Sequence, residues 1–377
     1  MKSPAIPALA LVLSAVLPAA AGEQLPNLHG VPASERTVLP LEKTWPEKPG
    51  EAALCMWKGD KTAAITYGID DNCAMNIDWW LREAGSRGIR MTWFLITGNI
   101  DGSDRPALNG KWADWRRARE AGHALESHSM THLSGAENPE TWKGIDWEYG
   151  ESLRLICENI PGWTATCLAY PGGKNSGNNS EEVAARHVIA ARGGRGTPNP
   201  AQGIDYLSTC AMSRHNIGDD PKAPWSDVNR LFGPAERNNA YRGWAILFWH
   251  FIKEDDESVV ATARKSLDFY VGHKDELWMG TFAEVARYGQ ERETATLASA
   301  GDAKDGFEIT LTDRMADDRF DEPLTVKVRL PDDWTGVAAE QAGSPIPAQV
   351  IEHEGARFAL VDVIPDRGPA KLRVLRQ

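Results

Sequence analysis

The chain lacks long apolar runs, a C-x-x-C pair and an excess of positive charge. Beyond the N-terminal region no stretch of about 18 apolar residues occurs, so we expect no stable membrane insertion. Without a C-x-x-C pair, a zinc ribbon is excluded. Asp and Glu outnumber Lys and Arg by 53 to 41, and the net charge is −12. Phosphate binding needs clustered positive charge, so nucleic acid is not an expected partner. No protein partner is evident either.

The first residues instead have the pattern of a targeting segment. Lys2 precedes an apolar run over residues 5–17, and the alanines at 19–21 form a small-residue cleavage site. The run is too short to span a bilayer, although an uncleaved anchor is the alternative. We therefore predict a signal peptide over residues 1–21 and a protein exported to the periplasm or the extracellular space.

Five cysteines are present, and export makes disulfides possible. Cys157 and Cys167 are ten residues apart and are candidates for a bridge, with buried free thiols as the alternative. Because the count is odd, at least one cysteine stays unpaired within a single chain.

Hydrophobic patterning divides the rest of the chain. Residues 22–53 are rich in proline and charge and are interpreted as an N-terminal arm. Between residues 54 and 290, short apolar runs alternate with amphipathic stretches, which predicts an α/β domain built on a parallel sheet, open or closed into a barrel. Active residues of such folds lie at the C-terminal ends of strands. The expected strands are 63–67, 91–96, 123–126, 166–170, 188–191 and 245–250, and the expected helices are 76–87, 111–121, 146–159, 180–187, 257–272 and 281–288.

Around residues 289–305 the sequence turns polar and small, and we interpret this stretch as the join between two domains. Beyond it the hydrophobic period changes to two, as in Phe307, Ile309 and Leu311. Proline and glycine turns separate the short runs. This pattern predicts a small all-β, sandwich-like domain over residues 303–377.

Ionisable residues follow three of the predicted strands. Asp70 and Asp71 end the first, where one carboxylate could bind a metal while its neighbour reaches a bound water. Asp-Asp-Asn is also good turn chemistry, and the pair alone favours a solvated turn. His250 ends a strongly apolar strand, where a hydrogen-bonded core histidine is the usual interpretation.

His128 and His132 are four residues apart, a spacing that places both on one face of a helical turn. The zincin motif is excluded because Ser129 occupies the place of its glutamate. With Asp71 the histidines form a two-histidine, one-carboxylate set that leaves coordination positions open. Iron oxygenases use a similar set, usually with the carboxylate beside the first histidine, and the order here disfavours that alternative.

The order of these motifs resembles the polysaccharide deacetylases of carbohydrate esterase family 4, the NodB-homology group. The matching features are Asp70-Asp71, then the His-Ser-x-x-His of 128–132, then Tyr170-Pro171 before two glycines, then an apolar strand ending at His250. The resemblance covers roughly residues 55–290. It implies a distorted, incomplete (β/α) barrel, which agrees with the predicted alternation of strands and helices.

The resemblance also implies roles. Asp70 corresponds to the catalytic base and His250 to the catalytic acid. Tyr170 and Pro171 correspond to the groove wall, with the Tyr170 N–H binding the oxyanion. One divalent metal is expected, zinc first and cobalt or nickel as alternatives. The implied reaction is attack of metal-bound water on an acetyl group of an amino sugar or an acetylated polysaccharide. The metal ligands are Asp71, His128 and His132.

Three departures from the family pattern are visible. The usual Thr-Phe-Asp-Asp-Gly is replaced by the sequence of residues 68–72, which ends in Asn72. The arginine that steers the base in the Tyr-Pro motif is missing, and Arg192 or Arg195 is a candidate replacement. Asp205 is a candidate partner for the acid histidine, with a surface charge as the alternative.

Two other functions remain open. A hydrolase of another non-peptide C–N bond would use the same scaffold, although the signal peptide argues against it. A non-catalytic glycan-binding protein would keep the site as a relic. The β-domain is expected to pack on the barrel and shape its groove, with independent sugar binding as the alternative.

Overall fold

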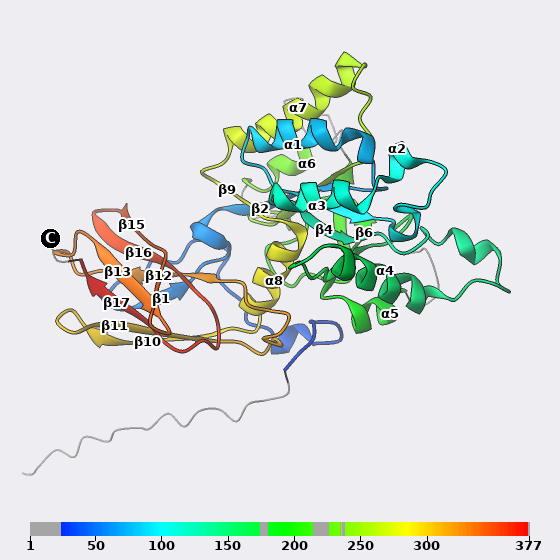
Figure 1. Ribbon diagram of the computed structural model, residues 1–377. Helices are drawn as coiled ribbons and strands as arrows, with labels where there is room; N and C mark the ends of the chain where they lie inside the picture. Colours follow the sequence, from blue (N-terminus) through cyan, green and yellow to red (C-terminus); the bar gives the residue numbers. More distant parts are fainter. Residues whose placement is uncertain (1–23, 174–179, 214–225, 234, 236–237, 376–377) are drawn as a thin grey trace, which may run out of the picture.

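The computed structural model describes residues 24–173, 180–213, 226–233, 235 and 238–375. They form a helix-covered barrel beside a body of antiparallel strands (Figure 1). The predicted signal peptide lies outside these ranges. Among the described helices, none has the length and apolarity that crossing a membrane requires.

The barrel is a closed ring of parallel strands. Pairing runs in chain order from β2 to β8, and β2 pairs with both β8 and β3, which closes the ring at seven strands among the described residues. A further strand, β9, pairs with the first residues of β2, and β3 pairs with its last residues. The (β/α) barrel is thus confirmed, with seven strands in its ring. The strands are β2 (Ala63–Ile69), β3 (Met91–Leu95), β4 (Ala124–Ser127), β5 (Cys167–Ala169), β6 (Ala190–Arg195), β7 (Thr209–Ser213), β8 (Trp244–Trp249) and β9 (Leu277–Met279).

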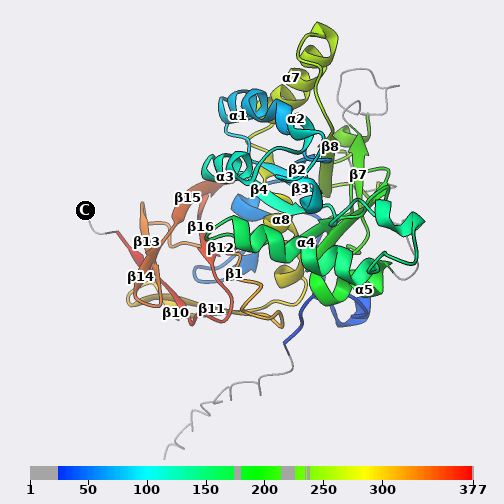
Figure 2. The ribbon, with the colours of Figure 1, turned by 45° about the vertical axis from the view of Figure 1, so that its right-hand side comes forward.

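Helices cover the outside of this ring (Figures 1 and 2). Every residue of β2 and β8 is buried, because a parallel strand covered on both faces must be apolar along its whole length. This is why the sequence shows continuous apolar runs there. The helices are α1 (Ile77–Gly85), α2 (Pro106–Asn109), α3 (Trp112–Glu120), α4 (Ile145–Asn159), α5 (Ser180–His187), α6 (Ser226–Asn229), α7 (Glu257–Gly272) and α8 (Phe282–Arg292).

The second body is a sandwich of two antiparallel sheets, as predicted. One sheet has the order β1-β12-β16-β15 and the other β10-β11-β17-β13-β14. β1 comes from the end of the N-terminal arm and pairs with β12, so the sandwich is completed by residues more than 250 positions away. The strands are β1 (Ala52–Leu54), β10 (Thr296–Asp302), β11 (Gly306–Thr312), β12 (Leu324–Arg329), β13 (Val337–Gln341), β14 (Ser344–Ile346), β15 (Ala348–His353), β16 (Ala356–Val363) and β17 (Ala370–Val374).

The polar stretch at 289–305 is not a simple join. α8 continues through Arg292, which is fully buried, and β10 then pairs with β11 along its whole length. Two of its buried polar side chains are held by hydrogen bonds: Arg292 donates to the carbonyls of Met56 and Ala201, and Gln290 donates to that of Ile189. α8 therefore lies between the barrel and the sandwich (Figure 2).

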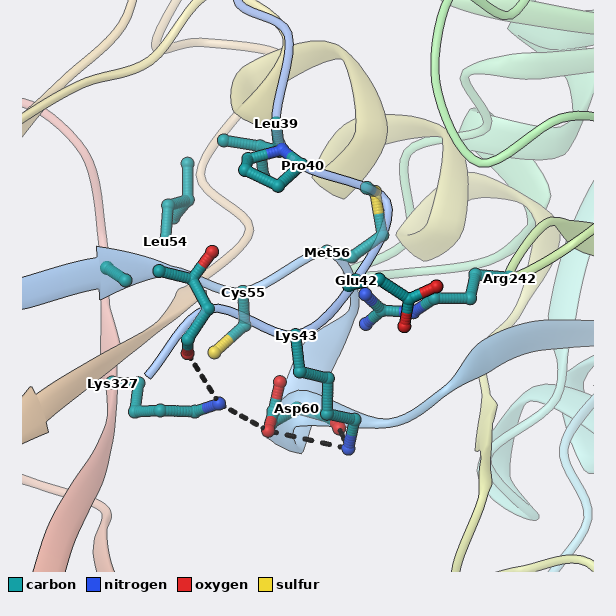
Figure 3. A pocket seen from close by; sticks show the side chains of 12 residues that line it. Leu39, Pro40, Glu42, Lys43, Leu54, Cys55, Met56, Asp60, Arg242 and Lys327 are labelled. Atoms are coloured by element: carbon teal, nitrogen blue, oxygen red, sulfur yellow. Dashed lines mark hydrogen bonds and ion pairs between the residues drawn. The ribbon is translucent and has the colours of Figure 1, made fainter. Parts of the chain in front are cut away.

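Buried ion pairs tie the two bodies to the arm. Asp60 lies 2.8 Å from the ammonium of Lys327 on β12 and 3.4 Å from that of Lys43 in the arm (Figure 3). The Lys327 ammonium also lies 3.5 Å from the ring centre of Trp45. These contacts hold the sandwich near Asp60, just before the first barrel strand begins. The candidate site lies at the opposite end of the barrel, where the strands finish.

Cys157 and Cys167 both carry free thiols, so the candidate bridge between them is not formed. Cys157 is exposed and Cys167 is buried.

Candidate active site

A cavity of about 220 Å³ opens at the C-terminal ends of the barrel strands. The strand ends and the loops that follow β2, β4, β5, β6 and β8 supply its walls. Its lining residues are Asp70, Asp71, His128, His132, Tyr170, Gly172, Gly173, Arg192, Gly193, Gly194, Phe248 and His250. The structure thus brings together the ionisable residues that the sequence singled out after three separate strands.

The turn after β2 has an unusual backbone. Asp71, Asn72 and Cys73 all have positive φ, at 58°, 61° and 55°. Asn72 tolerates this conformation better than most side chains, which explains how it stands where the family usually has glycine. Its buried amide accepts from the Ile96 N–H at 2.8 Å and donates to the Ile96 carbonyl at 3.2 Å. Asn72 therefore fastens the end of β2 to the end of β3.

Three acceptor atoms converge in the cavity. The Nε2 atoms of His128 and His132 lie 3.4 and 3.6 Å from Oδ1 of Asp71, and the three possible ligand atoms lie within 4.8 Å of one another. Nδ1 of His128 lies 2.7 Å from the carbonyl oxygen of Ala169, which can only accept. In the neutral ring, Nδ1 therefore carries the proton, and Nε2 has the lone pair.

This arrangement fits a divalent cation. Among the described residues, no donor makes a hydrogen bond to the buried Oδ1 of Asp71. Its lone pairs therefore face those of the two Nε2 atoms with no positive group between them. Burial alone would raise the pKa of Asp71, but His128, followed by His250 and His132, lowers it, which keeps the carboxylate ionised. Burial and then His128 lower the pKa of His132, which favours the ligating neutral ring. Two imidazoles and a carboxylate suit zinc with open positions.

The loop that carries the histidines is not the helical turn that their spacing suggested. Residues 128–133 have no helical assignment, and Ser129, His132 and Leu133 have positive φ. The two rings still meet, at 4.9 Å between centroids. His128 is 3% exposed and His132 41%, so the site is open to solvent on the His132 side.

Asp70 is paired with an arginine from the other side of the barrel. Nη2 of Arg192 lies 2.5 Å from Oδ2 of Asp70, and the two side chains are only 8% and 4% exposed. The guanidinium also lies over the rings of Phe94 and Phe248, at 5.2 and 4.6 Å. Of the two candidate arginines, the structure places Arg192 on Asp70, whereas the Arg195 side chain lies outside what it describes.

A bulge in β6 directs Arg192 inward. The register with β7 shifts between Arg192 and Gly194, and such bulges re-aim side chains. A Cβ at Gly194 would lie 2.7 Å from Sγ of Cys210, so only glycine fits there without a shift. The sequence signal for this bulge is the Gly-Gly pair that follows Arg192.

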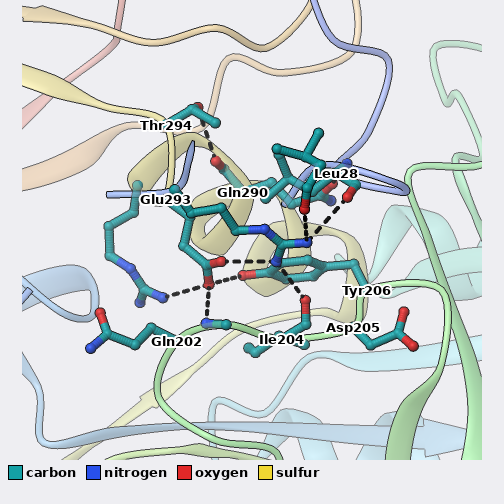
Figure 4. Close-up of polar contacts among 12 residues, drawn as sticks. Leu28, Gln202, Ile204, Asp205, Tyr206, Gln290, Glu293 and Thr294 are labelled. Carbon is teal, nitrogen blue, oxygen red and sulfur yellow. Dashed lines mark hydrogen bonds and ion pairs between the residues drawn. The ribbon is translucent and has the colours of Figure 1, made fainter. Parts of the chain in front are cut away.

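His250 follows β8 and borders both carboxylates. Its Nε2 lies 3.6 Å from Oδ2 of Asp71 and 4.0 Å from Oδ2 of Asp70, and the side chain is 46% exposed. Asp205 is not its partner: it lies in a separate cavity of about 270 Å³ and accepts from the Leu207 N–H. Figure 4 shows Asp205 beside Tyr206, which donates to Glu293. The surface-charge alternative describes Asp205 better.

The Tyr170 N–H is not available to an oxyanion. It donates to the Arg192 carbonyl at 2.9 Å, as part of the pairing between β5 and β6. The phenol is buried as well and donates to the Leu207 carbonyl. Pro171 has no N–H. The next donor along the chain is Gly172, which lines the cavity with φ at 67° and whose N–H has no acceptor among the described residues.

Fold and site together define a (β/α)-barrel protein. Two histidines and an aspartate form a cluster that could hold a metal ion, and the buried carboxylate of Asp70 lies beside it. A family model for polysaccharide deacetylase matches residues 58–189. Residues 58–189 of the barrel therefore belong to the polysaccharide deacetylase family that the motifs resemble.

A gellan lyase of a Bacillus species is 33% identical over 372 residues, which cover 93% of this chain and 14% of that protein. The chain therefore spans about a seventh of the length of this relative.

Solved structures show related folds at low identity. A family 4 carbohydrate esterase from Streptomyces lividans, in complex with acetate, is 17% identical, with a TM-score of 0.37. The match covers 61% of this chain and 96% of that one. The Xyl-CE4 domain of a xylanase from the hindgut metagenome of Trinervitermes trinervoides is also 17% identical, with a TM-score of 0.35. It covers 56% of this chain and 85% of that one.

Proposed function

We propose that this protein is a metal-dependent deacetylase that hydrolyses acetyl groups on a carbohydrate. One observation carries the proposal: a single cavity joins a three-ligand metal set to a carboxylate outside that set and to a histidine. These are the groups that hydrolysis needs, namely a metal site, a base and an acid. Membership of the polysaccharide deacetylases supports the acetyl group as the target.

Asp71, His128 and His132 would hold the metal, with zinc as the first choice and cobalt or nickel as alternatives. A divalent cation there would supply a water of lowered pKa and would polarise the acetyl carbonyl. Asp70 acts as the base. Arg192 occupies its Oδ2, whereas its Oδ1 has no donor among the described residues and is free to take the proton of the attacking water.

The other groups act on the carbonyl oxygen and the leaving group. Gly172 lines the cavity, and its N–H is our candidate for the main-chain donor that stabilises developing negative charge on the carbonyl oxygen. His250, when protonated, donates to the departing amine or alcohol as the bond to the acetyl carbon breaks. Its exposure lets it exchange protons with solvent. The products are acetate and the free amino or hydroxyl group.

We also propose that the protein is exported, on the strength of the N-terminal segment. The substrate would then be a glycan outside the cytoplasm. The Bacillus relative is described as a gellan lyase, so gellan belongs among the glycans to be tested.

Acetate release tests the proposal directly. The full chain is incubated with a panel of N-acetylated and O-acetylated glycans, including acetylated gellan, before and after chelation and after Zn²⁺ is restored. Chelator-sensitive acetate from any member is the expected result. Stoichiometric bound metal without acetate release would overturn the deacetylase proposal and favour a hydrolase of another C–N bond or a glycan-binding protein.

A further inference from the structure

A buried carboxylate on α4 contacts the loop that carries the two histidines. Glu148 is fully buried and accepts three hydrogen bonds. Two come from Thr131, whose N–H lies 2.8 Å from Oε2 and whose hydroxyl lies 2.5 Å from Oε1. The third comes from Nε1 of Trp142, 3.0 Å from Oε1. Thr131 lies between His128 and His132, so this carboxylate holds the residue next to a proposed ligand.

The loop needs such support because its backbone is intrinsically unfavourable. Ser129, His132 and Leu133 all have left-handed backbone, a conformation that side chains other than glycine rarely adopt. One side of the loop is fixed by main-chain bonds, since the Gly98 N–H donates to the Met130 carbonyl at 2.8 Å. The other side is fixed by Glu148.

We infer that Glu148 is a positioning residue for the metal site, holding His132 where it can share a cation with His128 and Asp71. The inference rests on the proposed metal-dependent function. The Glu148 side chain suits the task because both of its oxygens accept hydrogen bonds and it lies in the first turn of α4, where the helix dipole favours negative charge.

A neutral amide does not reproduce these contacts. A glutamine offers one acceptor oxygen and one NH₂ group. The Thr131 hydroxyl can rotate to accept from the NH₂ group. The N–H groups of Thr131 and Trp142 cannot, and they reach different oxygens of Glu148. Glu148→Gln therefore leaves one of them facing a donor. Outer partners of ligand residues typically change metal affinity 10–100-fold when they are replaced.

The metal affinity of the apo protein is the decisive measurement, because it does not depend on turnover. Metal is removed with a chelator, and the dissociation constant for Zn²⁺ is measured by competition with a chromophoric chelator, alongside the Tm of the apo form. Glu148→Gln is expected to weaken Zn²⁺ binding 10–100-fold. Trp142→Phe is the matched control, since it removes a donor to the same carboxylate without touching the histidine loop, and it should bind Zn²⁺ within about twofold of wild type.

Thr131→Val tests the contact from its other end. It keeps the main-chain bond, loses the hydroxyl bond and occupies a half-buried position that accepts valine, so it remains informative if Glu148→Gln does not fold. It should weaken Zn²⁺ binding several-fold, because the loop loses the hydrogen bond from the Thr131 hydroxyl to Glu148.

Wild-type affinity in Glu148→Gln, or in Thr131→Val if the former does not fold, would overturn the inference. An equal loss of Zn²⁺ affinity in Trp142→Phe would show that Glu148 has only a general structural role, and it would also overturn the inference. Failure of the wild-type protein to bind Zn²⁺ would instead contradict the proposed metal dependence.

Discussion

Arg192 and Asp70 are 122 positions apart in the sequence, and their side chains form a buried ion pair at the floor of the cavity. The pair crosses the ring from β6 to the end of β2. Arg192 occupies Oδ2 of Asp70 and lies over two phenylalanine rings, so Oδ1 is the oxygen left for the proposed role as base.

Arg192→Ala should impair stability and turnover together. Removing one partner of a buried ion pair typically costs about 3–5 kcal/mol, because the other charge is left without compensation. We expect a fall of about 3 kcal/mol in the free energy of unfolding, measured in urea, and at least a hundredfold fall in kcat. Zn²⁺ content should not change. Arg192→Lys keeps the charge but loses the planar contact with Phe94 and Phe248, so it should be intermediate. Full kcat in Arg192→Ala would show that Asp70 needs no partner.

Asp70→Asn and His128→Ala should separate the base from the metal site. Asp70→Asn keeps the shape and the three ligands, so it should retain metal while kcat falls by about 10²–10⁴-fold. His128→Ala removes a buried ligand, so metal and activity should be lost together. Metal content by elemental analysis beside initial rates of acetate release checks both. An Asp70→Asn protein with the wild-type rate would remove Asp70 as the base.

Metal binding should also stabilise the fold. A ligand that binds only the native state at a hundred times its dissociation constant adds about 2.7 kcal/mol. Zn²⁺ should therefore raise the Tm of the chelator-treated wild-type protein, and His128→Ala should show no such rise. Magnesium serves as the control ion, because a site with two imidazoles prefers zinc. An equal rise with both ions would argue against a site formed by Asp71, His128 and His132.

Replacing Asn72 should loosen the turn that presents both aspartates. Asn72→Ala leaves the Ile96 N–H and carbonyl without their partners and places alanine at positive φ, so we expect a loss of about 3 kcal/mol. Asn72→Gly loses the same bonds but accepts the backbone conformation, and should be about 1 kcal/mol less destabilising. Chemical denaturation of the two variants gives the comparison. Equal stabilities would mean that backbone strain at Asn72 is negligible.

Glu126 should make stability fall as the pH rises. This carboxyl on β4 is fully buried, and burial raises its pKa from 4.5 to about 7, against the opposing hydrogen bonds from the Cys167 and Thr166 N–H groups. The native state holds a proton that the unfolded chain has already lost, so the contribution of Glu126 to stability is greatest below pH 4.5 and is lost as the pH rises through about 7. The total loss is up to about 3 kcal/mol.

Glu126→Gln should remove that part of the pH dependence. Both N–H groups donate to a single oxygen of Glu126, so the amide oxygen can replace it. The decrease in the free energy of unfolding between pH 4.5 and pH 8 should be smaller in the variant than in the wild-type protein. Burial also raises the pKa of Asp313 to about 7, so some decrease with pH will persist in both proteins. An unchanged wild-type slope in Glu126→Gln would contradict the assignment.

Several elements escaped prediction for physical reasons. β7, Thr209–Ser213, mixes small polar and apolar residues, and β9 has only three residues, so neither shows a recognisable period. β10 is largely exposed, so its sequence carries little apolar alternation. Pairing with neighbouring strands, which a local pattern does not contain, decides that these segments are extended.

The sequence alone determined the alternation of buried strands and helices and the positions of the ionisable residues at strand ends, because hydrophobic periodicity and strand termini are local properties. Tertiary structure decided what those residues do to one another. It closed the ring of strands and paired Asp70 with Arg192 rather than with a neighbour of Tyr170. It also used the Tyr170 N–H in a hydrogen bond to β6 and buried Glu148 against the loop that carries the histidines. Such contacts join residues far apart in the chain, and their geometry exists only once the strands have paired.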